Sequence, residues 1–177
     1  PATPLPPTVK LHSQEGLNLV ARIIDAESLP ADISRALCNR PDRRFVPVFL
    51  RHIRKASAKE NTTFYLDQAL LHSVDAKQDL EAVDYIEGTF KAGKRHPSSP
   101  ETWTATSILG ETGNPKYVPL LRDLWETHKD NKHCLIGNTV VAKALAQLGS
   151  AEGLEQLVKS ANSDNEAART EAVMGLA

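Results

Sequence analysis

Apolar residues recur along the chain in a pattern that is repeated four times. In each copy, an apolar pair ends one helical segment, a turn follows, and a second amphipathic segment opens with an apolar residue nine positions after the leucine of the pair. The leucines are separated by 34, 38 and 36 residues, a period typical of solenoids built from helical hairpins. The pairs are Ala36-Leu37, Leu70-Leu71, Ile108-Leu109 and Ala144-Leu145, and the openers are Val46, Leu80, Val118 and Leu154.

The segments around each turn have the periodicity and the end signals of helices. Apolar residues spaced by three or four positions predict one buried stripe per segment. Ser99 before Pro100 predicts a helix start, and the run 163–166 fits a capping box that opens a last helix. The predicted stripes contain Phe45, Val46, Phe49 and Ile53; Leu80, Val83, Tyr85 and Ile86; Val118, Leu121, Leu124 and Trp125; and Leu154, Leu157, Val158 and Ala161.

Two stretches also resemble a known repeat. Residues 110–121, GETGNPKYVPLL, resemble the centre of a HEAT-like repeat of the short bacterial kind that is also seen in phycobilin lyase subunits, and residues 142–154 match it again. Residues 35–50 are a fainter copy, and residues 71–86 are the weakest because they lack the glycine and the proline. Pattern and resemblance together predict an all-α fold, a right-handed α-solenoid of stacked helical hairpins.

The same pattern divides the chain into segments. A Pro-rich leader or linker is expected over 1–13 and the solenoid over 14–177. Within the solenoid we expect a lead-in helix at 14–26, repeats at about 31–58, 61–93, 99–130 and 134–161, and a partial repeat at 163–177. Because the last segment has no second helix to cover Leu176, we expect the chain to be a piece of a longer protein.

Composition narrows the function classes. Hydrophobic residues make up 41% of the 177 residues and charged residues 24%, which is typical of globular proteins. The net charge of −1 argues against a molecule built as a nucleic-acid polycation. The two cysteines, Cys38 and Cys134, fall three repeats apart in the predicted layout, too far for a disulfide.

Charge is nevertheless uneven along the repeats. Residues 35–59 carry a net charge of +7, and residues 60–90 carry −6. The HEAT-like resemblance implies that the second helices line a concave face, which would place both blocks in one bipolar groove for a protein or peptide partner. Alternatively, neighbouring hairpins of opposite sign pair with each other. The candidate partner-binding residues are Arg51, Arg54, Lys55, Asp84, Glu87, Arg122 and Glu126.

The sequence contains no evident catalytic or metal-binding motif. His128, His133 and Cys134 have no zinc-ligand spacing, and the chain lacks the His-Glu pairs with which deoxyhypusine hydroxylase, a HEAT-like enzyme, holds iron. We therefore predict a non-catalytic scaffold with no catalytic residue, no metal site and no cofactor. Two alternatives remain open. One is an accessory domain of a lyase-like or cofactor-handling enzyme whose chemistry lies elsewhere, and the other is a nucleic-acid backbone binder that uses the 35–59 block, which the adjacent acidic block disfavours.

Overall fold

Helices make up the regular structure of the chain wherever the structure, a computed structural model, describes it. The described residues are 16, 22, 41–55, 61–129 and 135–176, and no strand occurs among them. The all-α prediction is confirmed. The 3-10 helices are η1 (Arg43–Phe45) and η2 (Pro115–Tyr117), and the α-helices are α3 (Val46–Lys55), α4 (Asn61–Ser73), α5 (Leu80–Lys91), α6 (Pro100–Glu111), α7 (Val118–His128), α8 (Leu135–Gln147), α9 (Ala151–Ala161) and α10 (Glu166–Leu176).

Several predictions concern residues outside the described part. These are the leader 1–13, the first helix of the repeat at 31–58, and both cysteines. In the lead-in helix expected at 14–26, Gly16 and Arg22 are described, and both are helical.

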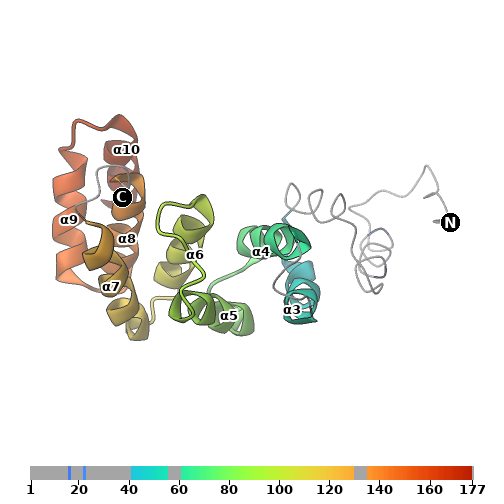
Figure 1. The fold of residues 1–177 in the computed structure, drawn as a ribbon. Coiled ribbons are helices and arrows are strands. Elements are labelled where there is room, and N and C mark those ends of the chain that lie inside the picture. The colour runs from blue at the N-terminus through green and yellow to red at the C-terminus, as the bar shows by residue number, and fades with distance from the viewer. Residues whose placement is uncertain (1–15, 17–21, 23–40, 56–60, 130–134, 177) are drawn as a thin grey trace. The chain divides into compact units, whose positions relative to one another are not determined.

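The chain forms two compact units, Pro1–Ser73 and Val74–Ala177. In the first unit, α3 packs against α4. The second unit contains α5 to α10 (Figure 1). The boundary falls inside the repeat expected at 61–93, so its two helices, α4 and α5, belong to different units. The repeat boundaries as a whole stay a prediction.

Most helix starts follow the predicted signals. Val46, Leu80 and Val118 are the first residues of α3, α5 and α7. Asp42 caps η1 by accepting a hydrogen bond from the Arg44 N–H, Asn114 caps η2 in the same way for Lys116, and Ser99 caps α6. In each case a short polar side chain satisfies a backbone N–H that the helix itself leaves unpaired.

One predicted cap is wrong. The last helix begins at Glu166, because Asn165 rather than Ser163 accepts the capping hydrogen bond, from the Ala168 N–H at 2.9 Å. The helix α9 begins at Ala151, directly after Ser150, which has the residue type and repeat position of an N-cap, so the apolar opener Leu154 is its fourth residue.

The repeat leucines form the core of their units. Leu71, Leu109 and Leu145 are buried, while Leu37 lies outside the described residues. Trp125 is also buried, as its helical spacing predicts. However, Leu80, Leu154 and Val158 are exposed, so the stripes predicted for α5 and α9 are too wide. In α9 the buried line runs through Gly153 and Leu157, which leaves Leu154 and Val158 on an adjacent side of the helix.

Small residues let the helices of the second unit approach closely. A Cβ atom built on Gly110 of α6 would lie 2.7 Å from the Ala144 Cα on α8, so a larger residue would push these helices apart. Gly153 fulfils the same role between α9 and α8. The helices α8, α9 and α10 pack against one another, and α6 packs on α8 (Figure 1). The hairpins of this unit therefore share one continuous core.

Candidate interaction surfaces

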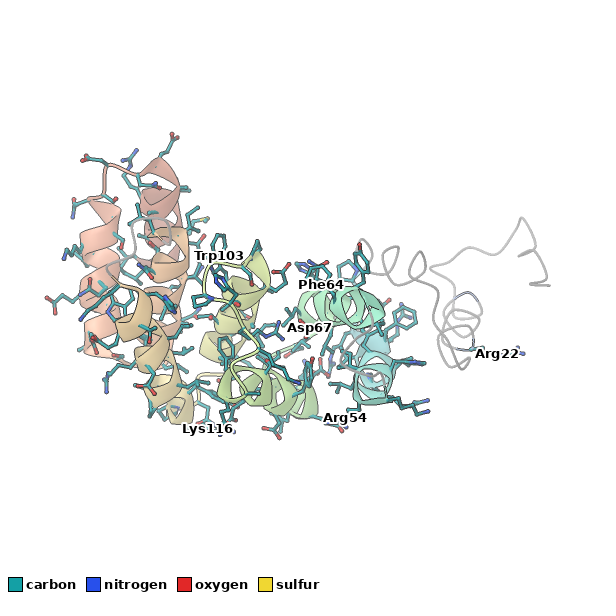
Figure 2. All side chains as sticks on the ribbon, viewed as in Figure 1. Arg22, Arg54, Phe64, Asp67, Trp103 and Lys116 are labelled. Atoms are coloured by element: carbon teal, nitrogen blue, oxygen red, sulfur yellow. The ribbon has the colours of Figure 1, made fainter. Side chains whose placement is uncertain are left out.

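The exposed side of α3 is basic. Its buried side carries Val46, Phe49, Leu50 and other apolar residues, so the charged residues are left on the opposite side. Figure 2 labels Arg54 in the last turn of this helix. We call the exposed cations of η1 and α3 the basic face: Arg43, Arg44, Arg51, Arg54 and Lys55.

Within the basic face, Arg44 is paired with a nearby carboxylate. Arg44 donates hydrogen bonds from Nε and Nη2 to the Asp42 carboxylate at 2.9 and 2.6 Å. This contact raises the pKa of Arg44. Asp42 is the one acidic residue in the sequence 41–55, so this segment has a net positive charge. Arg51, Arg54 and Lys55, three of the predicted partner-binding residues, thus share one exposed helix side in the first unit.

The predicted acidic residues of α5 lie in the second unit and are paired there. Lys116, which is labelled in Figure 2, lies in η2 between the two helices of the next hairpin. Its Nζ lies 3.7 Å from Asp84 and 3.2 Å from Glu87. Lys91 donates a further hydrogen bond to Glu87. The bond from Lys91 lowers the pKa of Glu87, as does the contact with Lys116. Lys116 also lies over the ring of buried Tyr117, 4.6 Å from its centroid.

The remaining predicted residues belong to α7. Arg122 donates from Nε to Glu152 of α9 at 3.1 Å, and Glu126 accepts from Lys129 at 2.7 Å. Both pairs are partly exposed to solvent, where an ion pair contributes little stability. Arg122 and Glu126 are therefore accessible to a partner, but a partner has to compete with the existing contacts.

The contacts between hairpins follow the repeat register. Asp84 and Arg122 each lie thirteen residues after a repeat leucine, and Lys116 and Glu152 each lie seven residues after the next one. The same two positions thus pair twice, once as Asp84–Lys116 and once as Arg122–Glu152, with the charges exchanged. Sequence reasoning missed Lys116 and Glu152, although opposite charges at these two spacings are the signal that would have found them.

The predicted bipolar groove joins residues from both units. Arg51, Arg54 and Lys55 lie in the first unit, and Asp84, Glu87, Arg122 and Glu126 lie in the second. Within the second unit, Asp84 and Glu87 of α5 form ion pairs with Lys116. The groove as a whole stays a prediction.

His128 ends α7 beside a small internal cavity. The cavity is lined by residues that include Trp103, Thr106 and Asn138. Burial lowers the pKa of His128, and the nearby His96 lowers it further. His133 and Cys134 lie outside the described residues. Within 41–55, 61–129 and 135–176, no group of three or more His, Cys, Asp or Glu side chains is arranged to hold a metal ion.

Comparison with known proteins identifies the family. A family model described as HEAT repeats matches residues 86–177, which is more than half of the chain. The chain belongs to the HEAT repeat family. The search of curated proteins found no match. HEAT repeats generally serve as protein-interaction scaffolds and are typically non-catalytic. Every helix among the described residues is too short or too polar to traverse a bilayer.

Proposed function

We propose that this HEAT-repeat chain is a non-catalytic module that binds an acidic segment of a protein or peptide through the basic face of α3. The observation that carries the proposal is the division of α3 into two sides, with apolar residues buried and Arg51, Arg54 and Lys55 exposed. Cations three and four residues apart on one helix are neighbours in space. They can therefore contact successive carboxylates of an extended or helical partner.

The second part of the proposal concerns the candidate residues on α5 and α7 of the second unit. Asp84, Glu87, Arg122 and Glu126 would then select a partner that carries both basic and acidic groups, because the two candidate residues on α5 are acidic and those on α7 are one basic and one acidic residue. Their existing ion pairs reduce the affinity that each contributes, since a partner exchanges one partly exposed pair for another. We assign affinity mainly to the basic face, because its cations are gathered on one exposed helix side, and selectivity to the residues on α5 and α7.

Charge reversal on α3 tests the proposal. A short fluorescein-labelled polyglutamate peptide is titrated with the protein, and binding is followed by fluorescence anisotropy. We expect Arg51→Glu/Arg54→Glu to weaken binding by about tenfold or more, because both cations become repulsive. The control is Lys94→Glu/Lys159→Glu, which places the same charge change on exposed lysines of the second unit.

The outcomes separate the proposal from its alternative. Equal losses in the two double variants would show a response to net charge alone, and unchanged binding would exclude the basic face. A single-stranded DNA oligomer that binds more tightly than polyglutamate, with a steep salt dependence, would favour the nucleic-acid alternative.

A further inference from the structure

A small cavity lies inside the second unit, between three consecutive helices. Trp103 and Thr106 of α6, His128 of α7, and Gly137 and Asn138 of α8 are among the residues that line it. The cavity has room of about 10 Å³ for the centre of a water molecule. This is close to the space that a single water molecule requires, and it is too little for a larger ligand. The size of the cavity therefore suits one water molecule.

The hydroxyl group of Thr106 indicates that the cavity has a polar occupant. Thr106 is fully buried, and its Oγ1 atom has no hydrogen-bond partner among the described residues. Leaving a buried hydroxyl group unpaired is costly, so native proteins nearly always provide a partner, either a protein atom or an ordered water molecule. The described side chains around Thr106 do not provide that partner.

Two other threonines of this unit pair their hydroxyl groups within their own helices. Thr104, which also belongs to α6, donates to the Pro100 carbonyl oxygen at 3.1 Å, and Thr139 of α8 donates to the Leu135 carbonyl oxygen at 3.0 Å. This bond to the carbonyl group four residues earlier is a common local solution for a helical threonine. Thr106 does not make it, so its hydroxyl group remains for a ligand in the cavity.

The other polar groups that line the cavity differ in how far they are already paired. Trp103, which is labelled in Figure 2, donates from Nε1 to the Pro97 carbonyl oxygen at 3.0 Å, so its one donor is used. Asn138 donates from Nδ2 to the carbonyl oxygens of His128 and Lys129, at 3.1 and 3.3 Å. The Asn138 Oδ1 atom therefore remains as an acceptor, and the His128 ring has nitrogens that can donate or accept.

The walls of the cavity are held in place by close packing. A Cβ atom built on Gly137 would lie 2.5 Å from the Trp103 Nε1 atom, so the indole ring lies directly against the backbone of α8. The hydrogen bond from Trp103 to Pro97 fixes the ring there. Because the ring cannot shift without losing these contacts, the cavity does not close by a small movement of Trp103.

We propose that this cavity binds one ordered water molecule, which pairs with the Thr106 hydroxyl group and bridges it to Asn138 and His128. Three hydrogen bonds are the usual number for a buried water molecule. The three residues belong to α6, α7 and α8, so the water joins one hairpin to the first helix of the next. It thereby stabilises the contact between successive hairpins, on which a repeat scaffold depends. The site is independent of the basic face of α3.

Removing the Thr106 hydroxyl group tests the site, because a paired and an unpaired hydroxyl group predict changes of opposite sign. Thr106→Val keeps nearly the same shape and a similar helix propensity. If a water molecule pairs with Thr106, the variant loses this bond, and we expect the melting temperature of the full chain to fall by about 2–4 °C. If the hydroxyl group has no partner, valine removes the cost of burying it, and the melting temperature should rise.

Magnetic relaxation dispersion of oxygen-17 in water provides a direct measurement, because it counts the water molecules that stay in a protein for longer than the protein takes to tumble. We expect Thr106→Val to lose one such water molecule relative to the wild-type chain. Thr106→Ser keeps the hydroxyl group and should therefore keep the water molecule, even where loss of the methyl group lowers the melting temperature. The serine variant separates the hydroxyl group from the packing of the side chain.

Thr104→Val is the matched control. It makes the same chemical change in the same helix, at a hydroxyl group that is already bonded to its own helix. We expect it to keep the number of long-lived water molecules and to change the melting temperature by less than the Thr106→Val substitution does.

Three results would overturn the proposal. A melting temperature that rises or stays the same in Thr106→Val would show that the hydroxyl group has no partner to lose. An unchanged number of long-lived water molecules in Thr106→Val would show that the residue acts through protein contacts alone. Loss of a water molecule in Thr106→Ser, which keeps the hydroxyl group, would show that this group does not hold the water.

Discussion

At the residue scale, glycines control how closely the helices of the second unit approach. Gly153→Ala would place a Cβ 2.5 Å from the Ala146 nitrogen, and because that atom is backbone, the helices α8 and α9 must move apart. We expect a loss of about 1–3 kcal/mol in the free energy of unfolding, measured by urea denaturation. A Cβ added to Gly88 of α5 would meet no neighbouring side chain within 4 Å among the described residues, so Gly88→Ala should instead stabilise the protein by about 0.5–1 kcal/mol. If both substitutions changed the free energy of unfolding in the same direction and by a similar amount, Gly153 would not be needed for the close approach of α8 and α9.

His128 provides a second prediction at this scale, on pH dependence. Burial and His96 hold its pKa below the ordinary value of 6.5, so in acid the unfolded chain takes up this proton before the folded chain does. The folded state therefore has its full stability above pH 6.5 and loses stability as the pH falls through 6.5 towards the lowered pKa. We expect the melting temperature to fall between about pH 7.5 and 5.5, and to fall about 1–3 °C less in His128→Gln. The exposed His72→Gln variant should behave like the wild-type protein, and an equal pH response in His128→Gln would refute the prediction.

At the element scale, charge pairs match neighbouring hairpins of the second unit. Arg122→Glu places two carboxylates together at the contact between α7 and α9, and we expect the melting temperature to fall by about 1–3 °C at low salt. Arg122→Glu/Glu152→Arg reverses the pair, as in the natural exchange between Asp84–Lys116 and Arg122–Glu152, and should restore most of the loss. If the melting temperature of the double variant falls by the sum of the decreases in the two single variants, the two residues are not coupled.

Helix type and helix starts could be predicted because they depend on local chemistry. The cap at Ser99 is predicted from the sequence, and Asp42 and Asn114 act in the same way, since each satisfies a backbone N–H within three residues. Contacts between hairpins could not be read in the same way. Whether Leu154 is buried depends on which helix lies against it, and whether Asp84 is paired depends on Lys116, thirty-two residues away. The repeat register explains these burial states and ion pairs only once it is known which helices pack against each other.

At the scale of the whole molecule, the division into two units was not predicted. The turn after Leu71 lacks the glycine and proline of the other repeats, and the boundary falls there, between Ser73 and Val74. The family match, over residues 86–177, lies entirely within the second unit. The part of the chain with the clearest repeat signal is thus also the part in which consecutive hairpins share one core.

This organisation predicts that the second unit folds alone. Its largest buried side chains include Ile86, Leu109, Leu121, Leu145 and Leu157, which come from five consecutive helices of the same unit. In a repeat stack each hairpin is stabilised by its neighbours, so a fragment of residues 74–177 keeps the contacts that bury these residues. We expect this fragment to have a helical circular dichroism spectrum and to melt cooperatively.

Leu145→Ala should lower the free energy of unfolding of the fragment by about 2–5 kcal/mol, because the substitution creates a cavity where α8 and α9 meet. A fragment that is unfolded, or that melts without a cooperative transition, would show that its core needs residues of the first unit.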